Sequence, residues 1–149
     1  MNKFLHAIFF ILFLWLLSFG IATFFFGSST DISIGDKIAV IPIKGMITLE
    51  GGSSLLTTTT SGTEIVAKIK DAQDDNQIKA IVLEINSGGG TVLGSKIVAD
   101  AIKETEKPVI AVISEYGASG AYWIASQADL IYADDLSFVG SISVLGSHL

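Results

Sequence analysis

The chain opens with an unbroken apolar run before any regular alternation of polar and apolar residues begins. Residues 4–26 read FLHAIFFILFLWLLSFGIATFFF, and His6 is the only ionisable side chain among them. A helix of about 20 apolar residues spans the core of a bilayer. A secretory signal has a shorter apolar region and a clear small-residue cleavage site, for which residues 27–29 are a weak match. We therefore expect an uncleaved transmembrane helix, with residues 1–27 as the membrane anchor.

The residues that flank this run predict its orientation. Lys3 precedes it, and Asp31 and Asp36 follow it. Basic residues favour the cytoplasmic side of a membrane span. We expect a single-pass protein of the cell membrane whose remaining part lies outside the cytoplasm, with residues 28–36 as a linker and residues 37–149 as the folded domain.

After residue 36, strand-like apolar runs alternate with segments of helical periodicity. Runs rich in β-branched residues predict strands at 37–43 (continued to 47 past a bend at Gly45), 78–86, 108–114, 130–133 and 138–145. Apolar residues at helical spacing predict helices over 63–73, after Thr91 and from 119 to 128. This order predicts an α/β fold around a largely parallel sheet.

Three local features refine this outline. The helix over 63–73 should bury Ile65, Ile69 and Ala72. Thr91 suits the N-cap of the next helix, whose apolar stripe should comprise Val92 or Leu93, Ile97, Val98, Ala101 and Ile102. Residues 50–62, EGGSSLLTTTTSG, predict a flexible loop.

Two glycine-rich turns fall where a predicted strand meets a helix: NSGGG at 86–90 and YGASG at 116–120. Reactive groups gather at this edge of a parallel sheet, so we expect the turns to lie together. Unhindered amide N–H groups there can stabilise a developing oxyanion. Gly120 is one candidate donor, and Gly89 or Gly90 the other; the simpler interpretation is that these glycines only permit tight turns.

Ser119 lies among small residues and is a candidate nucleophile, but a serine needs a neighbouring base. His6 lies in the expected anchor and His148 is the penultimate residue, so neither supports a Ser-His-Asp triad. The segment GASGA also departs from G-x-S-x-G, because Ala121 replaces the last glycine. A desolvated lysine can serve as base, yet no lysine follows Ser119. These residues leave the base unassigned.

Composition excludes several other functions. The formal net charge is -6, and all nine basic residues are lysines, a poor composition for binding a phosphate backbone. The absence of cysteine removes disulfides, thiolate metal sites and a cysteine nucleophile. The acidic residues show no metal-ligand spacing, and NSGGG lacks the lysine and hydroxyl of a phosphate loop. We expect no nucleic acid, metal or cofactor.

Four ordered segments resemble peptidase family S49, the signal peptide peptidase A group: KIAVIPIKGMI, INSGGGTVLGSKIVADAI, KPVIAVISEYGASGAYWIASQADLIYAD and FVGSISVLG. The resemblance runs from about Ile38 to Leu145. It implies a Clp-protease/crotonase-like fold of repeated strand-helix units, one N-terminal membrane helix and assembly into homo-oligomeric rings. It also implies cleavage of signal-peptide remnants or other membrane-associated peptides by a Ser–Lys dyad.

By position, the resemblance makes Ser119 the nucleophile, Gly120 one oxyanion donor and Gly90, or less favourably Gly89, the other. Gly88 replaces the proline of the family turn, which should loosen that turn. The family's general-base lysine follows the strand that GSISV matches, and the printed sequence ends a few residues later. The base is therefore expected outside these 149 residues: in a longer protein, or supplied by a partner, unless a natural truncation has lost it.

Two other functions stay open beside a membrane-anchored serine peptidase. A catalytically inactive pseudo-peptidase would bind peptides or assemble with full-length relatives, and the missing lysine favours it. The same fold can also hold a thioester enolate of acyl-CoA in glycine amides, but the expected anchor and the small-residue surroundings of Ser119 argue against that chemistry.

Overall fold

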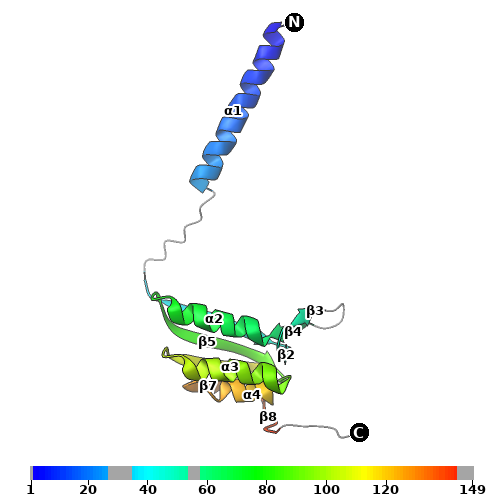
Figure 1. The fold of residues 1–149 in the computed structure, drawn as a ribbon, viewed down its shortest axis with the longest axis vertical. Coiled ribbons are helices and arrows are strands. Elements are labelled where there is room, and N and C mark those ends of the chain that lie inside the picture. Colours follow the sequence, from blue (N-terminus) through cyan, green and yellow to red (C-terminus); the bar gives the residue numbers. More distant parts are fainter. Residues whose placement is uncertain (1, 27–34, 54–57, 144–149) are drawn as a thin grey trace. The chain divides into compact units, whose positions relative to one another are not determined.

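The computed structural model describes residues 2–26, 35–53 and 58–143 (Figure 1). The chain divides into two units, Met1–Ile34 and Gly35–Leu149. The first contains helix α1 (Asn2–Phe26). Within the described ranges, no helix meets the combined length and apolarity of a membrane span. The membrane anchor over residues 1–27 thus stays a prediction from the sequence.

The second unit is built on a parallel sheet, which confirms the predicted α/β fold. Its strands run in the order β1-β5-β6-β7, and all neighbours are parallel. A further strand, β8, pairs with the last three residues of β6. Their bounds are β1 (Lys37–Lys44), β5 (Ile78–Ser87), β6 (Val109–Ala118), β7 (Leu130–Ala133) and β8 (Phe138–Gly140).

Three helices share one apolar core with one face of this sheet. They are α2 (Gly62–Asp74), α3 (Val92–Glu104) and α4 (Gly120–Ala125), and α2 lies beside α3 (Figure 1). As predicted, α2 buries Ile65, Ile69 and Ala72. Alternate residues of the strands fill the other side of the core, since side chains of a strand alternate between its faces: Ile41, Ile43, Ile81, Leu83, Ile85, Val109, Ala111 and Ile113.

A small second sheet corrects the loop predicted over residues 50–62. It comprises β2 (Met46–Thr48), β4 (Thr58–Ser61) and β3 (Gly52–Ser53), in the order β2-β4-β3. Residues 54–57 lie outside the described residues. The threonines are β-branched and favour strands, and Thr60 Oγ1 also donates to the carbonyl of Lys44. The composition that suggested a loop therefore builds a strand. Gly45, at φ +71°, makes the predicted bend between β1 and β2.

The predicted boundaries and stripe of the later elements need three further corrections. Val92 and Leu93 are 51% and 54% exposed, because the first turn of α3 projects beyond the core. Its buried face comprises Gly94, Ser95, Val98, Ala99 and Ile102. Strand β6 continues to Ala118 and absorbs part of the predicted glycine turn, while β8 ends at Gly140. Residues 144–145 of that predicted strand lie outside the described residues.

Candidate active site

The two glycine turns meet at the carboxyl ends of β5 and β6, as predicted. A Cβ built on Gly89 would lie 2.8 Å from the amide N of Gly120 and 2.9 Å from Cβ of Ser119. Gly89 also has φ +100°, which an L side chain rarely adopts. Only glycine at this position lets the backbone of one turn touch the backbone of the other.

Ser119 joins β6 to α4 in a strained backbone conformation. Its φ and ψ are 52° and -124°, outside the basins favoured by residues with a Cβ. Hydrogen bonds hold it there: its N–H donates to Gly140 O at 2.8 Å, and Trp123 N–H donates to Ser119 O at 3.0 Å. The Ser119 side chain makes no capping bond to α4. The fold thus fixes this serine without using its hydroxyl.

This sharp strand-to-helix turn is the geometry of a nucleophile elbow, although the sequence departs from G-x-S-x-G. In this turn, the positions with no room for a side chain are Gly117 and Gly120, and not the last position of that pattern. A Cβ at Gly117 would meet side-chain atoms of Ile113 at 2.6–3.0 Å, and one at Gly120 would lie 2.1 Å from Ser95 Oγ. Ala121, by contrast, is buried with its methyl group accommodated. Ala121 is therefore compatible with an elbow in this fold.

The turn at residues 88–90 is held from two sides. Ser87 Oγ accepts a bond from Gly89 N–H at 3.0 Å and donates to Gly45 O at 2.5 Å. Ile47 of β2 pairs with Gly90 through Ile47 N–H to Gly89 O (2.9 Å) and Thr91 N–H to Ile47 O (2.8 Å). Thr91 is the N-cap of α3, as predicted, and its side chain accepts from Gly94 N–H.

Two backbone amides beside Ser119 have no hydrogen-bond partner among the residues that the structure describes. Among the described residues, neither Gly90 N–H nor Gly120 N–H donates a hydrogen bond. The Gly90 nitrogen lies 3.5 Å from the point where a Cβ of Gly120 would sit, so the amides flank the same region. Gly89 contributes close packing instead, since its carbonyl is used by Ile47 and its N–H by Ser87. In the described structure, Gly90 and Gly120 therefore offer free N–H groups beside Ser119, and Gly89 does not.

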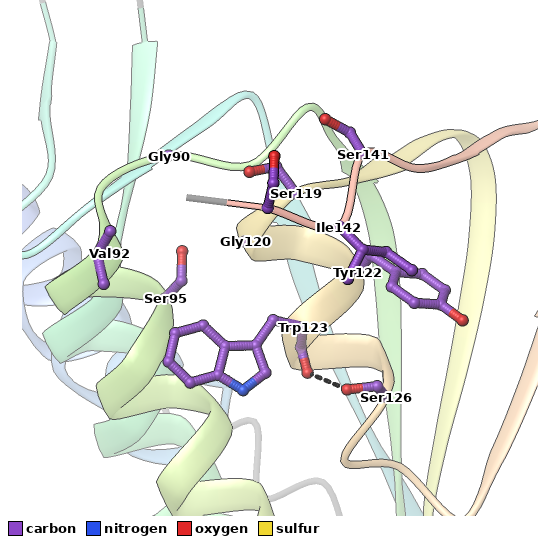
Figure 2. A pocket seen from close by; sticks show the side chains of 11 residues that line it. Gly90, Val92, Ser95, Ser119, Gly120, Tyr122, Trp123, Ser126, Ser141 and Ile142 are labelled. Carbon is purple, nitrogen blue, oxygen red and sulfur yellow. Dashed lines mark hydrogen bonds between the residues drawn. The ribbon is translucent and has the colours of Figure 1, made fainter. Parts of the chain in front are cut away.

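A cavity of about 510 Å³ opens in front of these groups (Figure 2). Its lining combines the predicted site with aliphatic, aromatic and hydroxyl side chains: Gly90, Val92, Ser95, Ser119, Gly120, Tyr122, Trp123, Ser126, Ser141, Ile142 and Ser143. Sequence reasoning missed Ser95 and Trp123. Their spacing could have indicated them. Ser95 lies one helical turn after Thr91, the N-cap of α3, and Trp123 lies one turn after Ser119, the N-cap of α4.

No lysine or histidine within the described ranges lines the cavity. Lys44 pairs with Glu84 at 2.8 Å, and Lys96 pairs with Asp100, so neither lysine is placed as a base for Ser119. His148 lies outside the described residues. The described side chains also bring together no group of three that could bind a metal ion.

Gly88 offers a first testable change. It is exposed, and a Cβ there would meet nothing within 4 Å. The preceding Ser87 ends a strand, the conformation that favours a following proline. We expect Gly88→Pro to raise the free energy of unfolding by about 0.4–1 kcal/mol, because proline restricts the unfolded chain. Urea denaturation of both proteins in detergent measures this, and a lower midpoint in the variant would contradict it.

Comparisons with known proteins identify relatives of this chain. Residues 101–149 match the model of peptidase family S49. The chain is 37% identical over 116 residues to Protease 4 of Haemophilus influenzae. The aligned part covers 75% of this chain and 18% of that protein. It is also 36% identical over 114 residues to Serine protease SPPA, chloroplastic, of Arabidopsis thaliana. That alignment covers 74% of this chain and 17% of the relative.

The fold also matches a solved structure, a mutant of the 1510-N membrane-bound stomatin-specific protease. The TM-score is 0.63 at 23% identity, covering 77% of this chain and 52% of that one. This match shows the fold, and the sequence relatives are serine proteases. The chain belongs to peptidase family S49. It spans less than a fifth of the length of the two relatives just named.

Proposed function

We propose that this chain carries the nucleophile and oxyanion hole of a membrane-associated serine endopeptidase. The observation that supports this best is the meeting of a strained serine, Ser119, with two unused amides at Gly90 and Gly120 on one cavity wall. Strained backbone at a cleft is typical of functional sites. Membership of a serine peptidase family supports the same assignment.

In the proposed reaction, Ser119 Oγ attacks the carbonyl carbon of a peptide bond while its proton passes to a base. The carbonyl oxygen gains negative charge and accepts hydrogen bonds from Gly90 and Gly120. The C–N bond then breaks, the leaving amine takes the proton, and water later hydrolyses the acyl-enzyme through the same steps. Each amide that meets the oxyanion is worth about 10²–10³ in rate. The family resemblance assigns the base to a lysine outside these residues.

The substrates we propose are signal-peptide remnants or other membrane-associated peptides. The cavity wall supports this through Val92, Trp123 and Ile142, which offer apolar surface for an apolar side chain. Anchoring through residues 1–27 is supported by the apolar run of the sequence, which contains no charged side chain from Phe4 to Phe26. We place the catalytic domain on the extracytoplasmic side of the cell membrane.

Self-association is part of the same proposal. Exposed apolar side chains on β7 and β8, including Leu130, Tyr132 and Phe138, support a homo-oligomer that covers this edge of the sheet. An inactive pseudo-peptidase is the second candidate, favoured by the absence of a lysine or histidine on the cavity wall within the described part of the chain.

Covalent labelling of Ser119 tests the proposal and separates the two candidates. A fluorophosphonate probe is added to the protein expressed from its complete reading frame in detergent-solubilised membranes. We expect labelling of the wild type and complete loss in Ser119→Ala, because the probe phosphorus bonds to the serine oxygen as fluoride leaves. Mass spectrometry locates the label. Equal labelling of the two proteins would exclude Ser119, and an unlabelled wild type would favour the pseudo-peptidase.

A further inference from the structure

One buried hydroxyl of the cavity wall has no hydrogen-bond partner. Ser95 lies on α3, its exposed fraction is 0%, and its Oγ is unpaired within the described part of the chain. The other two buried serines, Ser61 and Ser87, both form hydrogen bonds. An unsatisfied buried hydroxyl destabilises a protein, so each case in a folded chain calls for an explanation.

The position of Ser95 provides that explanation. A Cβ built on Gly120 would lie 2.1 Å from Ser95 Oγ and 3.5 Å from the amide N of Gly90. The hydroxyl and the two free amides therefore surround one small region of the wall. Figure 2 shows the Ser95 side chain pointing from α3 toward the Gly90 turn and the Ser119–Gly120 elbow.

The neighbours of Ser95 leave its hydrogen available. Gly120 packs its Cα against Ser95 Oγ, since a Cβ there would lie only 2.1 Å from that oxygen, and a Cα carbon cannot accept a hydrogen bond. A hydroxyl has two acceptor positions and one donor hydrogen. The donor hydrogen is therefore free for an oxygen that enters the cavity.

We propose that the Ser95 hydroxyl donates a third hydrogen bond to the substrate carbonyl oxygen held by Gly90 and Gly120. This inference rests on the proposed function and adds a side-chain donor to its oxyanion hole. Ser95 Oγ has no hydrogen-bond partner in the described part of the free chain, so a carbonyl oxygen that binds between the two turns and reaches Ser95 satisfies this hydroxyl. Preorganised donors aimed at developing charge stabilise it most strongly.

The rate of fluorophosphonate labelling in the full-length protein measures this contribution, because the phosphonyl oxygen occupies the oxyanion hole. We expect Ser95→Ala to label about 10²-fold more slowly than the wild type. Its melting temperature should be unchanged or higher, because the variant removes an unsatisfied buried group. Ser114→Ala is the matched control: its hydroxyl bonds to Ile85 O at 3.3 Å, away from the cavity wall, and it should label at the wild-type rate.

Two variants keep the test decisive. A folded Ser95→Ala that labels at the wild-type rate would overturn the inference, as would a rate loss fully explained by a lower folded fraction. If Ser95→Ala does not fold, Ser95→Cys keeps a side-chain donor, although sulfur is larger than oxygen and the S–H is a weaker donor. This variant should also label slowly, and wild-type speed would overturn the inference. An unlabelled wild type would overturn the proposed function together with this inference.

A structure of the phosphonylated protein gives a direct second readout. We expect Ser95 Oγ within about 3.2 Å of the phosphonyl oxygen, at hydrogen-bond distance. A purely structural serine would instead keep its present environment, with the phosphonyl oxygen bound by the two amides alone. That result would overturn the third-donor assignment while leaving Ser119, Gly90 and Gly120 in their proposed roles.

Discussion

Replacing Gly90 with alanine should both destabilise the domain strongly and abolish labelling of Ser119. A Cβ at Gly90 would lie 1.8 Å from the carbonyl O of Ile47 and 2.6 Å from its amide N. Backbone atoms of a paired strand have no rotamer to adopt, so β2 must leave the turn. We expect a cost of about 3 kcal/mol, from two lost backbone bonds and the strain of overpacking.

Gly88→Ala is the matched control, two residues earlier in the same turn. Its Cβ would meet nothing within 4 Å, so we expect a stability change within about 0.5 kcal/mol and wild-type labelling. Urea denaturation measures stability, and the fluorophosphonate rate reports on the oxyanion hole. If Gly90→Ala matched Gly88→Ala in both measurements, the packing of Gly90 on Ile47 would not hold the turn in solution.

The sequence predicted the parallel sheet and the place of the site because both depend on local patterns. The runs at 78–86 and 108–114 are rich in apolar and β-branched residues, as expected for strands of a parallel sheet that helices cover. Parallel strands also bring their carboxyl ends to one edge, so the turns NSGGG and YGASG had to be neighbours. The predicted proximity of the two turns follows from topology alone, and the close approach of Gly89 to Ser119 is how the structure realises it.

The features that sequence reasoning missed depend on contacts between distant segments. The strand at Thr58–Ser61 forms because β2 and β3 pair with it on either side. Its own residues show no hydrophobic pattern that would predict a strand. Ser95 similarly looks like an ordinary polar residue of a helix. Its importance appears only when the elbow at Gly120, 25 residues later, packs against it.

Replacing Ser119 with glycine should abolish labelling and relieve backbone strain at the same time. Ser119 has φ 52°, and its side chain makes no capping bond. The fold therefore bears the backbone strain of a Cβ at this position and gains no helix-cap bond in return. Glycine adopts positive φ without this strain, so Ser119→Gly should relieve it while removing the nucleophile.

We expect Ser119→Gly to be more stable than Ser119→Ala by about 1 kcal/mol, since strain of about 1–3 kcal/mol is partly offset by the greater unfolded-state entropy of glycine. Ser119→Ala is the matched control, because it also lacks the hydroxyl but keeps the Cβ. Neither variant should react with the fluorophosphonate. Thermal or urea unfolding of the two variants measures the free-energy cost of backbone strain at position 119, because neither has the hydroxyl. Equal stabilities would mean that the elbow relaxes in solution, and the nucleophile would then not be held in advance against the two amides.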